Sequence, residues 1–151
     1  MFSSWNRFKR SRDGVAAIEF AISLPIFIAV LVGLVEFGRA LHQANAIEKG
    51  LRAGAMYVAR AELPVDAATT TTITNLVQRG TTDTSGPYLV PGWSKAGASV
   101  SVDEQAVHTT VGAVPVRVFE VTATVPFTAI LPTLTPDFTI TRKHQQAYVG
   151  R

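Results

Sequence analysis

The longest apolar pattern lies near the start of the chain. From Phe20 to Val35 no residue is charged, and most are Ile, Leu, Val, Phe or Ala. Counted from Val15, with Glu19 as its one charge, the run reaches the roughly 20 residues that a helix needs to cross a bilayer. The pattern therefore predicts a membrane-spanning helix over residues 15–36, with a kink at Pro25 because proline removes a backbone donor. A buried core helix is the alternative, but so small a domain could hardly cover it on all sides.

Apolar residues then recur at helical spacing. Steps of three, four or seven connect Leu34, Phe37, Leu41, Ala44, Leu51, Ala55 and Val58. This amphipathic stripe predicts that the helix continues over residues 37–61. Gly50 and Gly54 form a small-xxx-small step with Ala46. Either the glycines let another backbone pack closely, which we favour, or Gly50 ends or bends the helix.

Residues 62–151 have the pattern of a small folded head. Residues 66–80 predict a second helix with Asp66 as N-cap and Gly80 beyond its end. The threonines at 69–72 weaken that prediction, because β-branched residues are poor helix formers. Residues 81–97 are rich in Gly, Pro, Ser and Thr and predict a loop.

The C-terminal third alternates apolar and polar residues as strands do. The predicted strands are ASVSVDE, VPVRVFEVTATVPF and FTITRKHQQAYV. In the second, the apolar parity switches near Val118, which suggests a bulge or a change of face. The fold class expected is α+β, with a long N-terminal helix packed on a small antiparallel sheet.

Charge is concentrated at the N-terminus. The formal net charge of the 151 residues is +3, and the basic leader, residues 1–14, carries Arg7, Lys9, Arg10 and Arg12 against Asp13 alone. By the positive-inside rule the N-terminus stays in the cytoplasm and the head, residues 62–151, lies outside it. The folded part has no basic cluster of the kind that nucleic acid requires.

A cleaved secretory signal is an alternative interpretation of the N-terminus. A cleaved secretory signal would use the Ala44-Asn45-Ala46 pattern, but Glu36 and Arg39 interrupt the approach to it. The absence of cysteine excludes a disulfide framework and a thiolate metal site.

The stretch DGVAAIEF stands between the leader and the span. Its pattern, Gly14, four residues, then Glu19 and Phe20, resembles the prepilin-peptidase site of type IV pilins, and of the Flp/Tad branch in particular. The segment from Gly14 to Arg60 resembles the TadE-like family of pilus-assembly proteins. Pro25, the Glu-Phe-Gly-Arg exit beginning at Glu36 and the AGAMYVAR stretch carry the rest of the likeness.

The resemblance implies cleavage between Gly14 and Val15. Cleavage would leave on Val15 a free amine that is largely protonated at neutral pH. Glu19 lies one helical turn away, so its carboxylate can neutralise that amine or a neighbouring subunit's. The resemblance also implies a minor pilin or pseudopilin, because major Flp pilins are much shorter.

The sequence has no arrangement of polar residues that is typical of a catalytic or metal site. His42, His108 and His144 lack metal-ligand spacing, and Asp103 and Glu104 would point to opposite faces of a strand. We expect no catalytic, metal or cofactor site and no small-molecule substrate.

Two function classes stay open. The first is a TadE-like structural component of the bacterial cytoplasmic membrane, or of the pilus, whose partners are a prepilin peptidase and other Tad pilins or pseudopilins. The second is an uncleaved, single-pass anchored domain that binds an extracytoplasmic partner.

Overall fold

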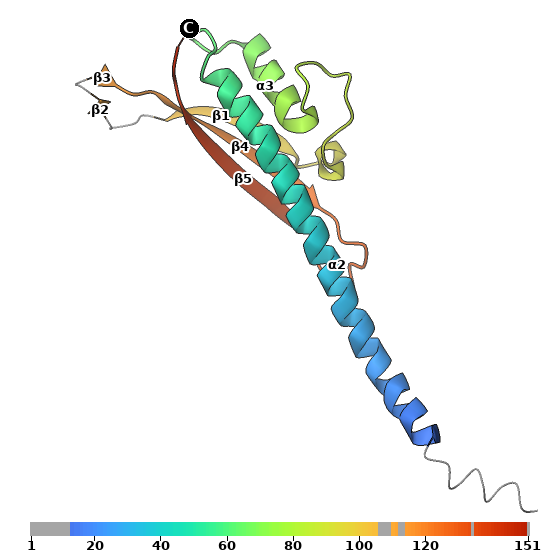
Figure 1. Ribbon diagram of the computed structural model, residues 1–151. Helices are drawn as coiled ribbons and strands as arrows, with labels where there is room; N and C mark the ends of the chain where they lie inside the picture. The colour runs from blue at the N-terminus through green and yellow to red at the C-terminus, as the bar shows by residue number, and fades with distance from the viewer. Residues whose placement is uncertain (1–12, 106–109, 112–113, 134, 151) are drawn as a thin grey trace, which may run out of the picture.

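A computed structural model describes residues 13–105, 110–111, 114–133 and 135–150 (Figure 1). The described elements are helices α2 (Asp13–Val58) and α3 (Ala67–Arg79), the 3-10 helix η1 (Pro91–Ser94), and strands β1 (Ser99–Gln105), β2 (Thr110–Val111), β3 (Val114–Pro115), β4 (Val118–Phe127) and β5 (Phe138–Ala147). The predicted α+β class is confirmed. The four basic residues of the leader lie outside the described residues.

Helix α2 is the longest element, and both α3 and the sheet pack against it. It runs without interruption from Asp13 to Val58 and contains Pro25. Its C-terminal half packs against the sheet and α3, whereas its N-terminal half projects alone from the head (Figure 1). The most apolar stretch is long enough to cross a membrane, and none of it is buried within the chain. The kink at Pro25 and the division into leader, span, extension and head stay predictions.

Helix α3 forms where the sequence predicted it, and its caps explain its limits. The Asp66 carboxylate accepts a 2.7 Å hydrogen bond from the Thr69 amide. Hydrogen bonding from the Thr69 side chain, and then from this amide, holds the pKa of Asp66 below its ordinary value. Gly80 ends the helix in the left-handed region, with φ 75°. The threonine hydroxyls donate to carbonyls four residues earlier, so the run is accommodated within the helix.

The sheet has the order β1-β4-β5 and is antiparallel throughout. Alternate residues of the central strand β4 face α2 and are buried: Phe119, Val121, Ala123, Val125 and Phe127. The register between β4 and β5 is unbroken from Val118 to Phe127. The bulge suggested near Val118 is therefore absent. The parity switch instead marks the point where one strand ends and the next begins, because β3 pairs with β2 in a separate two-stranded sheet.

The predicted stripe on α2 is correct from Ala44, which is 5% exposed, to its C-terminal end. Leu51, Ala55 and Val58 are buried, but Phe37 is 67% exposed and Leu41 is 49% exposed. A straight α-helix drifts by about 20° per seven residues, so positions selected by steps of seven leave the core-facing side after a few turns. Ile47, which the stripe omitted, is fully buried.

The two glycines of α2 allow α3 to approach closely. A Cβ on Gly50 would lie 2.4 Å from the Val77 carbonyl oxygen, and one on Gly54 would lie 2.8 Å from Val77 Cγ2. The helix continues past both residues. The close-packing interpretation is therefore confirmed, and the alternative, that Gly50 ends the helix, is wrong.

Gly50→Ala should destabilise the head. The added methyl meets a backbone carbonyl that cannot rotate away, so α3 must shift, at a cost of about 1–3 kcal/mol. Gly38→Ala is the matched control, because nothing lies within 4 Å of a Cβ placed there. Thermal unfolding in detergent, followed by circular dichroism, should show a clear loss of Tm for Gly50→Ala only. Equal Tm values would contradict the close-packing account.

Candidate functional site

The predicted processing segment occupies the first turns of α2. Gly14 lies one residue after the start of the helix at Asp13, and no atom lies within 4 Å of a Cβ built on it. Val15 and Phe20 are 57% and 62% exposed. The bond between Gly14 and Val15 is therefore free of contacts with the described part of the head.

Glu19 lies on this exposed segment without a side-chain partner among the described residues. Besides the backbone hydrogen bonds of the helix, the carbonyl of Glu19 accepts from the Ser23 hydroxyl at 2.8 Å. In the intact chain the nitrogen of Val15 is a peptide amide, which cannot carry a positive charge. A cationic partner for Glu19 must therefore come from cleavage, from the leader or from another molecule.

A second carboxylate, Glu36, lies where α2 meets the head, and its role was missed from sequence. It is 4% exposed. One oxygen accepts from the Arg39 guanidinium at 2.6 Å, and the other accepts from the Ile130 amide at 2.5 Å. A buried carboxylate is tolerated when it is paired in this way. The sequence signal was the Glu36–Arg39 spacing of three, which places both residues on one side of a helix.

The loop held by Glu36 connects β4 to β5. The Asp137 carboxylate closes it by accepting a 3.0 Å hydrogen bond from the Ala129 amide. Phe127 and Phe138, at its two ends, stack with ring centroids 4.7 Å apart, and Arg39 lies 5.3 Å above the Phe127 ring. Glu36 and Arg39 thus fix the loop to α2, while Asp137 and the aromatic pair hold the two ends of the loop together.

The other polar candidates lie apart. His42 is exposed, and His144 pairs with Glu48 at 3.3 Å, whereas His108 lies outside the described residues. Asp103 and Glu104 are neighbours on β1 and alternate in direction, as expected. Among the described residues no group of three His, Cys, Asp or Glu side chains could hold a metal.

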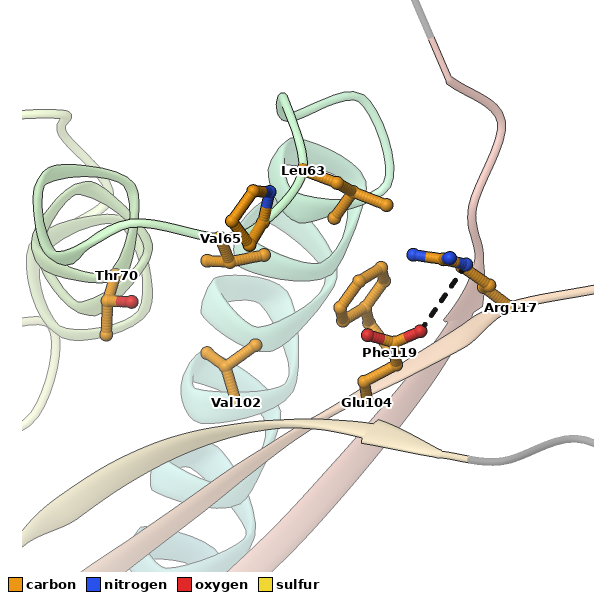
Figure 2. Close-up of a pocket in the computed structure, with 8 residues that line it drawn as sticks. Leu63, Val65, Thr70, Val102, Glu104, Arg117 and Phe119 are labelled. Carbon is orange, nitrogen blue, oxygen red and sulfur yellow. Dashed lines mark ion pairs between the residues drawn. The ribbon is translucent and has the colours of Figure 1, made fainter.

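A cleft of about 590 Å³ opens between the turn after α2, α3 and the sheet (Figure 2). Leu63, Val65 and Phe119 give it apolar walls, and an ion pair of 3.6 Å between Arg117 and Glu104 lies at its edge. Both charged side chains are about half exposed. Such a pair has the character of a solvated surface contact, because water screens it strongly.

Comparison with known families identifies the N-terminal segment. Residues 14–56 match the family model described as TadE-like protein. Residues 14–56 form a TadE-like segment. The predicted family is confirmed over this segment, which begins at Gly14 and ends within α2. No curated protein and no solved structure matches the chain.

The limits of the TadE-like segment agree with the division seen in the structure. It includes the processing motif, the apolar stretch, Glu36 and both packing glycines, and it stops before α3. The head contacts this segment at several places, among them the hydrogen bond from Ile130 to Glu36, the pair of His144 with Glu48 and the packing of α3 on Gly50. The family match covers the helix and does not extend into the head.

Glu36→Ala should release the loop between β4 and β5. The change leaves Arg39 and the Ile130 amide without their partner, and breaking a buried pair costs about 3–5 kcal/mol. Glu36→Gln should be milder, because its amide oxygen can still accept from Ile130. Hydrogen exchange of the Ile130 amide is the direct readout, and protection should fall strongly in Glu36→Ala.

Glu48→Gln is the matched control for this prediction, since Glu48 also pairs with an arginine on α2 but is 30% exposed. Its Ile130 amide should exchange as in the native chain. Unchanged protection in Glu36→Ala would show that the loop is held by other contacts.

Proposed function

We propose that the protein is a TadE-like minor pilin or pseudopilin, a membrane-anchored structural component of Flp/Tad pilus assembly. The observation that carries the proposal is the match that starts at Gly14 on a helix whose first half has no packing partner among the residues that the structure describes. Such a surface requires a bilayer, or other subunits, to cover it. The TadE-like family is a structural one, so we assign the chain no catalytic reaction.

The direction of insertion follows from charge. The basic leader remains in the cytoplasm, the apolar stretch crosses the cytoplasmic membrane, and the head lies outside. Glu36 fits this arrangement, because its buried pairing with Arg39 lies immediately after the last uncharged residue of the span. The prepilin peptidase and the other Tad pilins are the partners that this location requires.

Processing after Gly14 is compatible with the local structure. The bond lies in the first turn of α2, where backbone amides have no carbonyl partner within the helix and the end frays easily. Glycine weakens that turn by about a further 1 kcal/mol. The turn can therefore unwind into a peptidase without disturbing the packed half of α2.

After cleavage, Glu19 acquires the cation that it lacks. The amine of Val15 would lie at the positive end of the helix dipole, where a cation is unfavourable and a carboxylate is favourable. An unpaired charge at the bilayer centre costs at least about 2.5–3.5 kcal/mol, and at the edge of the span, where Glu19 lies, the cost is smaller but still favours pairing. Pairing of Glu19 with its own or a neighbour's amine removes that cost and favours one register of assembly.

Cleavage is tested by mass spectrometry of the N-terminus. In cells with an active prepilin peptidase, the native protein should begin at Val15, and Gly14→Ala should retain its leader. Gly38→Ala, on the same helix and equally free of contacts, should be processed normally. An intact leader on the native protein would refute the pilin-type proposal and favour an uncleaved, anchored binding domain.

Glu19→Ala tests the pairing. Insertion should be unchanged, because removal of a carboxylate makes the span more apolar. Incorporation into the Tad assembly should fall about tenfold or more, since the amine stays unpaired. Incorporation is measured as the assembled fraction relative to the membrane pool, with Glu48→Ala as a control that removes a carboxylate from the packed half of α2, outside the span. Equal fractions for Glu19→Ala and native protein would refute the pairing.

A further inference from the structure

An exposed apolar surface lies at the base of the head, next to the projecting half of α2. We call it the base patch and define it as Phe37, Ile130, Leu131 and Phe138, which are 67%, 61%, 40% and 46% exposed. Phe37 and Phe138 line the same shallow groove between α2 and β5. Ile130 is tied to the helix through its hydrogen bond to Glu36. The patch thus includes residues of α2, of the start of β5 and of the loop between β4 and β5.

We propose that the base patch is inserted into the lipid surface and forms a second membrane contact beside the span. The proposal rests on the membrane anchoring given under Proposed function. It assigns an occupant, the interfacial layer of the outer leaflet, to a loop for which the sequence suggested no role.

The exposed apolar surface of α2 is continuous from the span into the head. The apolar surface of the span does not end at Glu36, because Leu34 on its near side and Phe37 and Leu41 on its far side are all about half or more exposed. Glu36 itself faces the head and is covered. On the exposed side of α2, the helix therefore enters the head as an apolar surface, at the level where Ile130 lies.

Backbone amides of the loop between β4 and β5 donate to acceptors within the protein. Backbone groups that enter lipid must be satisfied internally. The amides of Ala129 and Ile130 donate to Asp137 and Glu36, and the Thr135 amide donates to the Leu131 carbonyl at 3.0 Å. Pro132 and Pro136 have no amide hydrogen to satisfy.

The sequence of the loop and of the strand before it carries little charge. No residue from Val121 to Pro136 is charged. The two nearest carboxylates, Glu36 and Asp137, are both occupied by loop amides, and Glu36 is also paired with Arg39. The loop can therefore approach a lipid surface without placing an unpaired carboxylate beside it. The Lys95 ammonium, which donates to the Thr128 hydroxyl of the loop, is a cation that anionic headgroups attract. A few apolar side chains beside a span then add an interfacial contact.

The consequence is that the head has a fixed orientation. A single span allows the head to rotate and tilt about one helix, whereas a second contact on one side of α2 restricts both motions. The cleft and the sheet edges would then face a defined direction above the membrane.

The test uses spin labels, because the chain has no cysteine and each label site is unique. Ile130→Cys and Leu131→Cys are labelled in the full chain, reconstituted in vesicles of phosphatidylethanolamine and phosphatidylglycerol. Collision with oxygen reports contact with lipid, and collision with a nickel chelate reports contact with water. We expect high oxygen and several-fold lower nickel accessibility at both sites than at Met56→Cys.

Two control sites make the outcomes distinct. Met56 is 55% exposed, close to the 61% of Ile130, but lies about 30 Å further along α2 from Glu36. Val30, 63% exposed, lies within the span and should show the lipid signature.

Water-like accessibility at 130 and 131 with a lipid signature at Val30→Cys would overturn the second contact and leave the anchor intact. Low accessibility to both reagents at 130 and 131 would also overturn it, since a protein surface would then cover the patch. A water signature at Val30→Cys would refute the membrane anchoring itself.

Discussion

The structure depends on one constraint, which is that a single continuous helix, Asp13–Val58, has a packing partner along only half its length. The C-terminal half meets this requirement within the chain, where Ile47, Leu51 and Val58 are fully buried against α3 and the sheet. The other half cannot, because the head ends near Glu36 and nothing else in the described chain covers it. Its apolar surface must be covered by lipid or by other subunits, and this requirement explains why a small, stable head is attached to a long helix.

Glu36 and the two glycines perform opposite tasks at the two ends of the packed half. Gly50 and Gly54 remove side chains so that α3 lies against the backbone of α2. Glu36 adds a charged group that the loop between β4 and β5 must cover, and this fixes the edge of the head on the helix. A force on the helix is therefore transmitted to the head through contacts at both places. A subunit that is extracted from a membrane and incorporated into an assembly needs such a connection.

Local patterns predicted most of the fold, and the failures have physical causes. The span, α3 with its caps and the buried parity of β4 follow from periodicity and capping residues. The stripe failed at Phe37 and Leu41, because steps of seven drift around a straight helix and because the head contacts only part of it. The role of Glu36 and of Ile130 depends on a contact between residues far apart in sequence, which no local pattern contains. The motif at Gly14 and Glu19 could be found from sequence because its parts are adjacent, although the partner proposed for Glu19 would exist only after cleavage.

The central claim is that Glu19 is paired with the amine of Val15 once the leader has been removed. A membrane-soluble, zero-length carbodiimide converts such a contact into an amide bond that mass spectrometry identifies. The account predicts that protein from isolated Tad assemblies yields a cross-link between the Val15 amine and the Glu19 carboxylate, within or between chains, and that Gly14→Ala yields none. A Val15 amine that stays free while Glu19 couples to another group would contradict it.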